Sequence, residues 1–131
     1  MSHENVELVR AGYEEANRLG EPAWWFLAPD IEWHTRADLP DSEVYRGHDA
    51  VRALFQEWTN AFEDARFDIQ DVLDRGDYVV VPTVLRGRIR GSADEVAMPE
   101  THVLKIRDGM AVELREYATL DEALEAVGLA E

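Results

Sequence analysis

Cysteine is absent from this chain, which excludes a disulfide framework and any metal site built on thiolates. Histidine is scarce, and the HxH or HxxxH spacing that metal sites favour is missing among His3, His34, His48 and His102. The sequence also has no glycine-rich phosphate loop and no GxSxG motif. We therefore expect neither a metal nor a cofactor.

The chain also lacks a long apolar segment. No run could span a bilayer, and residues 1–7 have neither the basic nor the apolar region of a signal peptide. Positive charge is in short supply too, since 13 basic residues face 28 acidic ones and leave a net charge of −15. Such a charge repels phosphate backbones and anionic lipids. We expect a cytoplasmic protein that binds neither nucleic acid nor membranes.

What is present suits one ordinary globular domain. The 131 residues are 46% hydrophobic and 31% charged, a balance far from that of disordered chains. A chain of this length buries most of its apolar surface in one core, and no repeat or linker interrupts it. Residues 1–131 are therefore predicted to form a single domain.

Apolar residues at helical spacing predict four helices, at residues 3–19, 23–28, 48–62 and 119–128. The first carries one inward stripe, formed by Val6, Val9, Tyr13 and Ala16. Proline ends the second helix, and a Thr-Leu-Asp-Glu capping box opens the last. Tyr13 is therefore expected to point into the core.

Alternating apolar and polar residues predict five strands, at residues 30–35, 67–73, 78–91, 96–106 and 110–118. Tight turns at Gly76 and at Asp108 and Gly109 make neighbouring strands antiparallel. Residues 37–47 are predicted to form a loop that acts as a lid. This order indicates an α+β fold, with helices on one face of a curved, largely antiparallel sheet around one apolar pocket.

The longest predicted strand has two different faces. Its apolar face, which we assign to the pocket, carries Val79, Val81, Thr83, Leu85 and Ile89. The opposite face presents three basic residues that resemble an anion site, Arg86, Arg88 and Arg90. In so acidic a chain we instead expect them to neutralise carboxylates nearby or across a dimer interface.

Several short segments stand in a characteristic order, namely Tyr13, NRLGE at 17–21, APDIEWH at 28–34, YRGH at 45–48, LKIRDG at 104–109 and REY at 115–117. Together they resemble SnoaL-like proteins of the nuclear transport factor 2-like superfamily, over almost the whole chain. The resemblance implies a cone-shaped α+β barrel with a pocket at its wide end, and a homodimer that pairs through the sheet. Relatives include steroid delta-isomerases, polyketide cyclases, limonene epoxide hydrolases and dehydratases, so the fold alone selects no reaction.

The steroid-isomerase pattern implies a tyrosine on the first helix and two aspartates, and Tyr13 matches the tyrosine. The position of the catalytic base falls at about Thr35, and threonine cannot accept a proton from carbon at neutral pH. The second aspartate falls on His102 if the preceding turn is one residue shorter here, and otherwise on Thr101. We favour His102, because Leu104 then continues the same inward face.

The epoxide-hydrolase pattern implies an Asp-Arg-Asp set whose first two members correspond to Thr83 and Leu85, and neither can play that part. The third corresponds to Glu116, where SnoaL-type cyclases also place an acidic residue. Glu116 shares the parity of Leu114, so its carboxyl group is expected at the pocket wall, where burial raises its pKa. The candidate catalytic residues are therefore Tyr13, His102 and Glu116.

The residues expected to line the pocket and contact a substrate are Phe26, Trp33, Thr35, Trp58, Thr83, Leu85 and Leu104. Each candidate also has a structural interpretation, because large apolar side chains at regular spacing belong first to the core. Tyr13 and His102 equally suit satisfied core positions, and Glu116 suits an ion pair with an arginine.

Two functions fit these observations. The first is an isomerase, cyclase or dehydratase acting on an apolar cyclic molecule, with His102 and Glu116 exchanging protons and Tyr13 donating to an oxygen. The second is a non-catalytic or stress-associated protein that holds an apolar ligand in the same pocket. A third alternative is an interaction protein whose sheet binds a partner chain.

Overall fold

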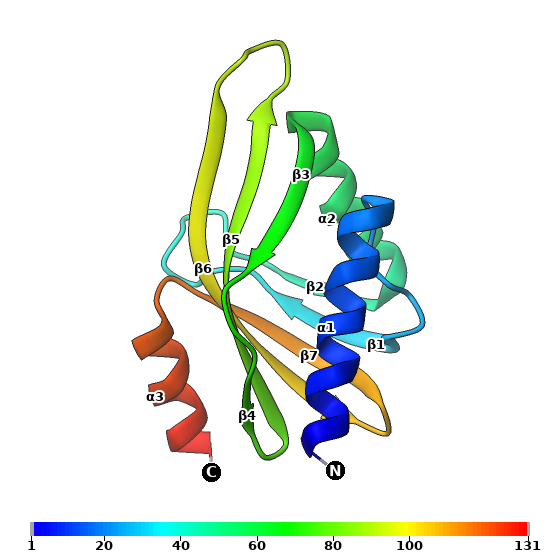
Figure 1. Cartoon of the computed structure of the whole chain (residues 1–131), viewed down its shortest axis with the longest axis vertical. Coiled ribbons are helices and arrows are strands. Elements are labelled where there is room, and N and C mark those ends of the chain that lie inside the picture. Colours follow the sequence, from blue (N-terminus) through cyan, green and yellow to red (C-terminus); the bar gives the residue numbers. More distant parts are fainter. Residues whose placement is uncertain (1, 131) are drawn as a thin grey trace.

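The computed structural model describes residues 2–130, which form three helices and a seven-stranded sheet (Figure 1). The helices are α1 (Ser2–Leu19), α2 (Gly47–Ala61) and α3 (Leu120–Ala130). The strands are β1 (Leu27–His34), β2 (Val44–Arg46), β3 (Phe62–Ile69), β4 (Leu73–Arg75), β5 (Tyr78–Ile89), β6 (Glu95–Arg107) and β7 (Met110–Tyr117). Within these residues, no helix combines the length and the apolarity that crossing a membrane requires.

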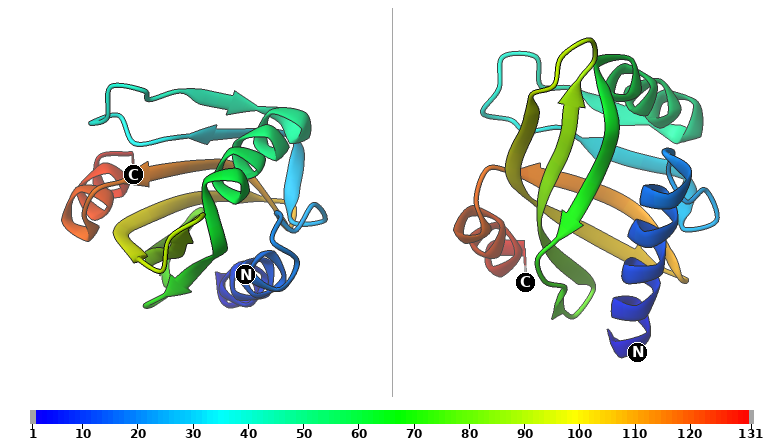
Figure 2. Two further views of the ribbon diagram at one scale, coloured as in Figure 1. Left: turned by 90° about the horizontal axis from the view of Figure 1, so that it is seen from above. Right: turned by 45° about the horizontal axis from the view of Figure 1, so that its top comes forward.

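The sheet is open and strongly curved, and the α+β class is confirmed. Its strands lie in the order β2-β1-β7-β6-β5-β3, with β4 paired to the first part of β5. Every pair is antiparallel except β1 with β7. α1 and α2 cover one face, here termed the inner face, whereas α3 packs on the other face against β5, β6 and β7 (Figure 2). The two faces therefore carry separate apolar cores.

The prediction of a helix at residues 23–28 is wrong. Residues 24–26 form a turn, and β1 begins at Leu27, which pairs with Ala111 of β7. Pro29 lies inside β1, in the stretch where the ladder with β7 is interrupted, so its missing N–H removes no ladder bond there. Pairing with a strand distant in sequence therefore outweighed the local apolar content of this segment.

Two further boundaries differ from the prediction. The loop expected at residues 37–47 ends in the edge strand β2, which pairs with β1 through Tyr45 and Trp33. The strand expected at 67–73 is two strands, because β3 begins at Phe62 and residues 70–72 separate it from β4. The remaining elements begin and end close to where the periodicity placed them.

The turns expected between strands are present and fix the sheet register. Gly76 has φ +75°, and Asp108 and Gly109 have φ +53° and +77°. Positive φ suits glycine and is tolerated by aspartate, so both turns follow from their residue types. The second turn joins β6 to β7 and sets His102 opposite Glu116 in the ladder.

The arginines of β5 neutralise nearby groups. Arg86 and Arg88 form ion pairs of 3.0 Å with Asp68 and 2.6 Å with Asp64. Arg90, just after β5, donates to the carbonyl oxygens of Thr59 and Asn60, at 2.6 and 3.2 Å, in the last turn of α2. A cation there suits the negative end of the helix dipole.

The face of β5 assigned to the pocket is only partly correct. Four of the five residues assigned to it are buried, namely Val79, Val81, Thr83 and Leu85. Ile89 is 43% exposed, because it lies toward the tip of the long β5–β6 hairpin that projects past the helices (Figure 1).

Candidate active site

A chain of three buried polar side chains lies on the inner face. The hydroxyl oxygen of Tyr13, from α1, is 2.6 Å from Nδ1 of His102 on β6. The other ring nitrogen, Nε2, is 2.8 Å from Oε1 of Glu100. All three residues are at least nine-tenths buried. Because a carboxylate only accepts, Nε2 carries a hydrogen, and in the neutral form of His102 the other nitrogen, Nδ1, accepts the hydroxyl hydrogen of Tyr13.

Strand alternation explains why these groups meet. Glu100, His102 and Leu104 are two residues apart on β6, so their side chains leave the same side of the strand. Thr101 has the opposite parity, and His102 is the residue that faces Tyr13. The parity that favoured His102 over Thr101 is therefore the one that the chain adopts.

Glu116 extends this cluster from β7. Its Oε2 accepts the indole N–H of Trp33 at 2.7 Å, and the backbone N–H of Arg36 also donates to its carboxylate. One nitrogen of His102 and one oxygen from each of Glu100 and Glu116 lie within 4.8 Å of one another. The three predicted catalytic residues thus converge, whereas their roles stay predictions.

Burial and mutual charge perturb these groups. Burial and the charge of Glu100 raise the pKa of Glu116 from 4.5 to about 7. Burial opposes the charged form of His102, but the hydrogen bond and charge of Glu100 outweigh it and raise the pKa above 6.5. Burial holds the pKa of Tyr13 well above its ordinary value. Glu116 therefore titrates near neutral pH, whereas Tyr13 keeps its hydroxyl hydrogen.

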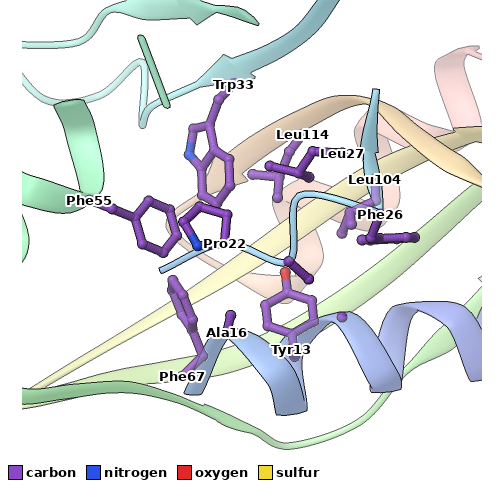
Figure 3. A pocket seen from close by; sticks show the side chains of 12 residues that line it. Tyr13, Ala16, Pro22, Phe26, Leu27, Trp33, Phe55, Phe67, Leu104 and Leu114 are labelled. Carbon is purple, nitrogen blue, oxygen red and sulfur yellow. The ribbon is translucent and has the colours of Figure 1, made fainter. Parts of the chain in front are cut away.

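An apolar cavity of about 30 Å³ lies beside the cluster, and its wall combines Tyr13 and Trp33 with side chains such as Phe26 and Leu104. Figure 3 shows the hydroxyl of Tyr13 directed among these side chains. Such a volume suits about one or two water molecules, and an organic ligand needs roughly ten times more. The interior is filled by aromatic rings whose centroids are 4.9–6.2 Å apart, those of Trp33, Phe55, Trp58 and Phe67.

Of the seven residues predicted to contact substrate, five line hollows of the interior. Phe26, Trp33 and Leu104 line the apolar cavity. Trp58 and Leu85 line a neighbouring hollow of about 20 Å³. These five residues therefore surround one aromatic interior.

The two threonines of that set are engaged elsewhere. The hydroxyl of Thr83 donates to the carbonyl oxygen of Asp68 at 3.1 Å, which ties β5 to β3. The hydroxyl of Thr35 donates to the carbonyl oxygen of Glu43 at 3.1 Å and accepts its N–H at 2.8 Å. Thr35 therefore holds together the ends of a surface segment.

A polar cleft of about 420 Å³ lies between residues 34–44, the end of β7 and the first turn of α3. Its wall includes Glu116 together with His34, Arg115 and Tyr117. Glu116 therefore joins the buried cluster to a hollow large enough for solvent to exchange.

The donor set of Glu100, His102 and Glu116 is one that a metal ion could use. Both nitrogens of His102 are already hydrogen bonded, so a metal would have to displace either Tyr13 or Glu100. A second such set, Glu32, His34 and Glu113, lies outside, where Arg46 and Arg115 pair with its carboxylates.

Glu100 is the residue that the sequence reasoning missed. It stands two positions before His102, so strand parity alone would have placed it on the inner face. The hydrogen bond between the two side chains explains how a fully buried histidine is satisfied.

Comparisons with known proteins identify a family from the sequence and a shared fold from solved structures. Residues 22–114 match the family described as SnoaL-like domain. Bal32a, from a soil-derived mobile gene cassette, aligns with a TM-score of 0.76 at 19% identity, over 96% of this chain and 97% of that one.

Two other solved structures align almost as well. A SnoaL-like polyketide cyclase, so described provisionally, from Jannaschia sp. CCS1 gives a TM-score of 0.72 at 21% identity, over 95% of this chain and 92% of that one. TerC, co-crystallised with polyporic acid, gives 0.73 at 20% identity, over 95% and 98%. No curated protein matches the sequence. At these identities the likenesses show the fold alone.

Proposed function

This chain belongs to the SnoaL-like domain family, and from that premise we propose that it is an acid–base enzyme that works without a cofactor. Its substrate is a small, largely apolar, cyclic molecule with an oxygen atom at the reacting centre. The reaction is that of an isomerase, a cyclase or a dehydratase, in which protons move between carbon and oxygen.

The observation that carries this proposal is the buried chain formed by Tyr13, His102 and Glu100. A tyrosine that only filled the core would need one hydrogen-bond partner. Here its partner is a histidine backed by a carboxylate, and its side chain lies in the wall of the apolar cavity. Perturbed groups that converge beside a cavity are typical of catalytic sites.

This chain of groups can take a proton from a ligand and return it. When the oxygen of Tyr13 accepts a proton from a ligand carbon, the hydroxyl hydrogen of Tyr13 moves to Nδ1 of His102. His102 is then an imidazolium, stabilised by the carboxylate of Glu100. Reversing both transfers gives a proton to a ligand oxygen or to another carbon, so the ligand is rearranged without net loss of protons.

The roles differ along the chain. Tyr13 is the catalytic residue, because it alone of the three lines the cavity. His102 and Glu100 act through it, the first as proton acceptor and the second as the charge that stabilises the acceptor. Glu116 adds a second negative charge when ionised, and its place on the polar cleft lets it exchange protons with solvent.

The test follows the conversion of cyclohex-3-en-1-one into its conjugated isomer, by ultraviolet absorbance. We expect the rate to fall about 100-fold or more in Tyr13→Phe, because acid–base groups contribute about that much. Tyr78→Phe is the matched control, since Tyr78 packs with the core under α3 on the other face. Equal rates in the wild type and Tyr13→Phe would remove the enzyme interpretation.

The apolar wall of the cavity supports a second function, in which the protein holds an apolar ligand without turnover. TerC, which has this fold, was co-crystallised with polyporic acid, and that supports an organic ligand in either case. Binding of 2-naphthol, followed by its fluorescence, separates the two. A carrier binds it with similar affinity in the wild type and Glu100→Gln, and neither protein isomerises the enone.

We also propose a cytoplasmic homodimer that pairs through the sheet. Apolar side chains on three strands support an interface, because Val44, Ile89 and Met98 remain 40%, 43% and 41% exposed. Sedimentation equilibrium should give twice the chain mass of 14.9 kDa. A monomer at all accessible concentrations would contradict the homodimer. Cell fractionation tests the cytoplasmic location.

A further inference from the structure

Any organic ligand of the apolar cavity needs the wall to move, because the cavity has a volume of only about 30 Å³. Most of the wall belongs to α1, α2 and the sheet, which are tied by helical and ladder hydrogen bonds. The exception is residues 20–26, here termed the strap, which joins α1 to β1 and contributes Pro22, Ala23 and Phe26 to the wall. The strap is therefore the part of the wall that can move at least cost.

The backbone of the strap is held at its two ends. The N–H of Gly20 donates to the carbonyl oxygen of Ala16 at 2.8 Å, and the carbonyl oxygen of Phe26 accepts the N–H of Ala111 at 2.8 Å. Gly20 has φ +73°, and a Cβ there would meet no atom within 4 Å. Gly20 lies in open space and in a backbone region that glycine enters freely, which suits a position where the chain can pivot.

Two adjacent tryptophans fasten the middle of the strap to different helices. Trp24 packs against His48 of α2 with its ring tilted by 46° and 4.9 Å between centroids, and the guanidinium of Arg52 lies 4.7 Å from the centroid of the tryptophan ring. Trp25 turns the other way and donates its indole N–H to Glu15 of α1 at 2.7 Å. The hydrogen bond of Trp25 and the cation over Trp24 are exposed to solvent, so each holds the strap only weakly.

We propose that the strap is the gate of the apolar cavity, latched to α1 by Trp25 and to α2 by Trp24, and that the ligand enters between these two helices when it swings open at Gly20. This inference rests on the proposed function in one respect, namely that the cavity takes up a ligand. Weak exposed latches on both sides hold the strap against the cavity, yet let it move without unfolding the sheet.

Thiol labelling tests the gate without a ligand, because the chain has no cysteine of its own. Ala23→Cys places a single thiol on the inner side of the strap, where Ala23 is 4% exposed. Weakening both latches, with Glu15→Ala for the hydrogen bond of Trp25 and Arg52→Ala for the cation over Trp24, should raise the rate of its reaction with Ellman's reagent about tenfold, since labelling follows the population of the open state.

Two controls separate gating from unfolding. Val103→Cys, 5% exposed under α3 on the other face, reports global unfolding and should label at one slow rate with or without the latches. Glu14→Ala, an exposed neighbour of Glu15, should leave the labelling of Ala23→Cys unchanged.

The gate is overturned if Ala23→Cys labels no faster than Val103→Cys, or if loss of the latches leaves its rate unchanged. Neither outcome involves turnover, so failure of the gate and failure of the proposed enzyme are distinguishable. A gate that opens in a protein inactive on the enone would point to the carrier function instead.

Discussion

Replacing Glu116 by glutamine should make the protein more stable at neutral and alkaline pH, although it removes a group of the candidate site. Burial and the charge of Glu100 raise the pKa of Glu116 from 4.5, the value expected in the unfolded chain, to about 7. The folded state therefore holds this proton more tightly than the unfolded state. Stability that is fully present below about pH 4.5 is lost as the pH rises toward and through about 7.

The magnitude follows from the two pKa values. A difference of about 2.5 between 4.5 and 7 corresponds to ~3 kcal/mol of unfolding free energy lost by the wild type across this window. Glutamine keeps an oxygen for the indole N–H of Trp33 but presents an amide to the backbone N–H of Arg36, which costs about 1 kcal/mol. The variant should therefore exceed the wild type by roughly 2 kcal/mol at about pH 8.

Urea unfolding followed by tryptophan fluorescence, at several values between about pH 5 and 8, measures this difference. The matched control is Glu113→Gln, on the same strand but the outer side, which should keep the pH dependence of the wild type. A wild-type stability that stays level between pH 5 and 8, or a variant whose stability falls equally, would refute the assignment of a buried carboxylate whose pKa is raised.

Three further predictions concern other parts of the molecule. Turnover requires a neutral His102, so the rate should increase with pH through the raised pKa of that residue. Glu100→Gln removes the main cause of the raised pKa, so the increase in rate should occur at lower pH in this variant. Gly12→Ala should lower stability by about 1 kcal/mol in thermal unfolding, because a Cβ there would lie 2.8 Å from the ring of Phe26, whereas Gly128→Ala, with open space, should not. Arg90→Ala should cost about 0.5–1 kcal/mol by removing the cation from the last turn of α2, with exposed Arg107→Ala as its neutral counterpart.

Much of the fold was readable because hydrophobic periodicity reports which face of an element is buried. The stripe that contains Tyr13 and the parity of His102 and Leu104 both predicted inward side chains, and the structure brings Tyr13 and His102 into contact. The expected resemblance to SnoaL-like proteins is confirmed over residues 22–114. The hydrogen bond between Glu100 and His102 was not predicted, because no sequence pattern identifies the partner of a buried histidine.

Other features depend on contacts between residues far apart in sequence. Residues 23–28 have a helical composition, but Leu27 gains a ladder partner on β7, and the preceding residues become a strap instead of a helix. Strand parity and the steroid-isomerase pattern both placed Thr35 at the pocket, and neither could foresee that Glu43 would hold it at the surface. Strand parity predicts the face to which a side chain points, whereas contacts with residues distant in sequence decide what surrounds that side chain.

The sequence by itself determined the fold class, the family and the inward direction of Tyr13, His102 and Glu116, since these depend on residue type and spacing. Only the tertiary structure decided that Glu100 completes the chain of polar groups and that the hollow beside it is nearly full. Cavity volume is the small remainder after large side chains have packed. It depends on how the rings of Trp33, Phe55 and Phe67 meet in three dimensions, which no spacing along the chain encodes.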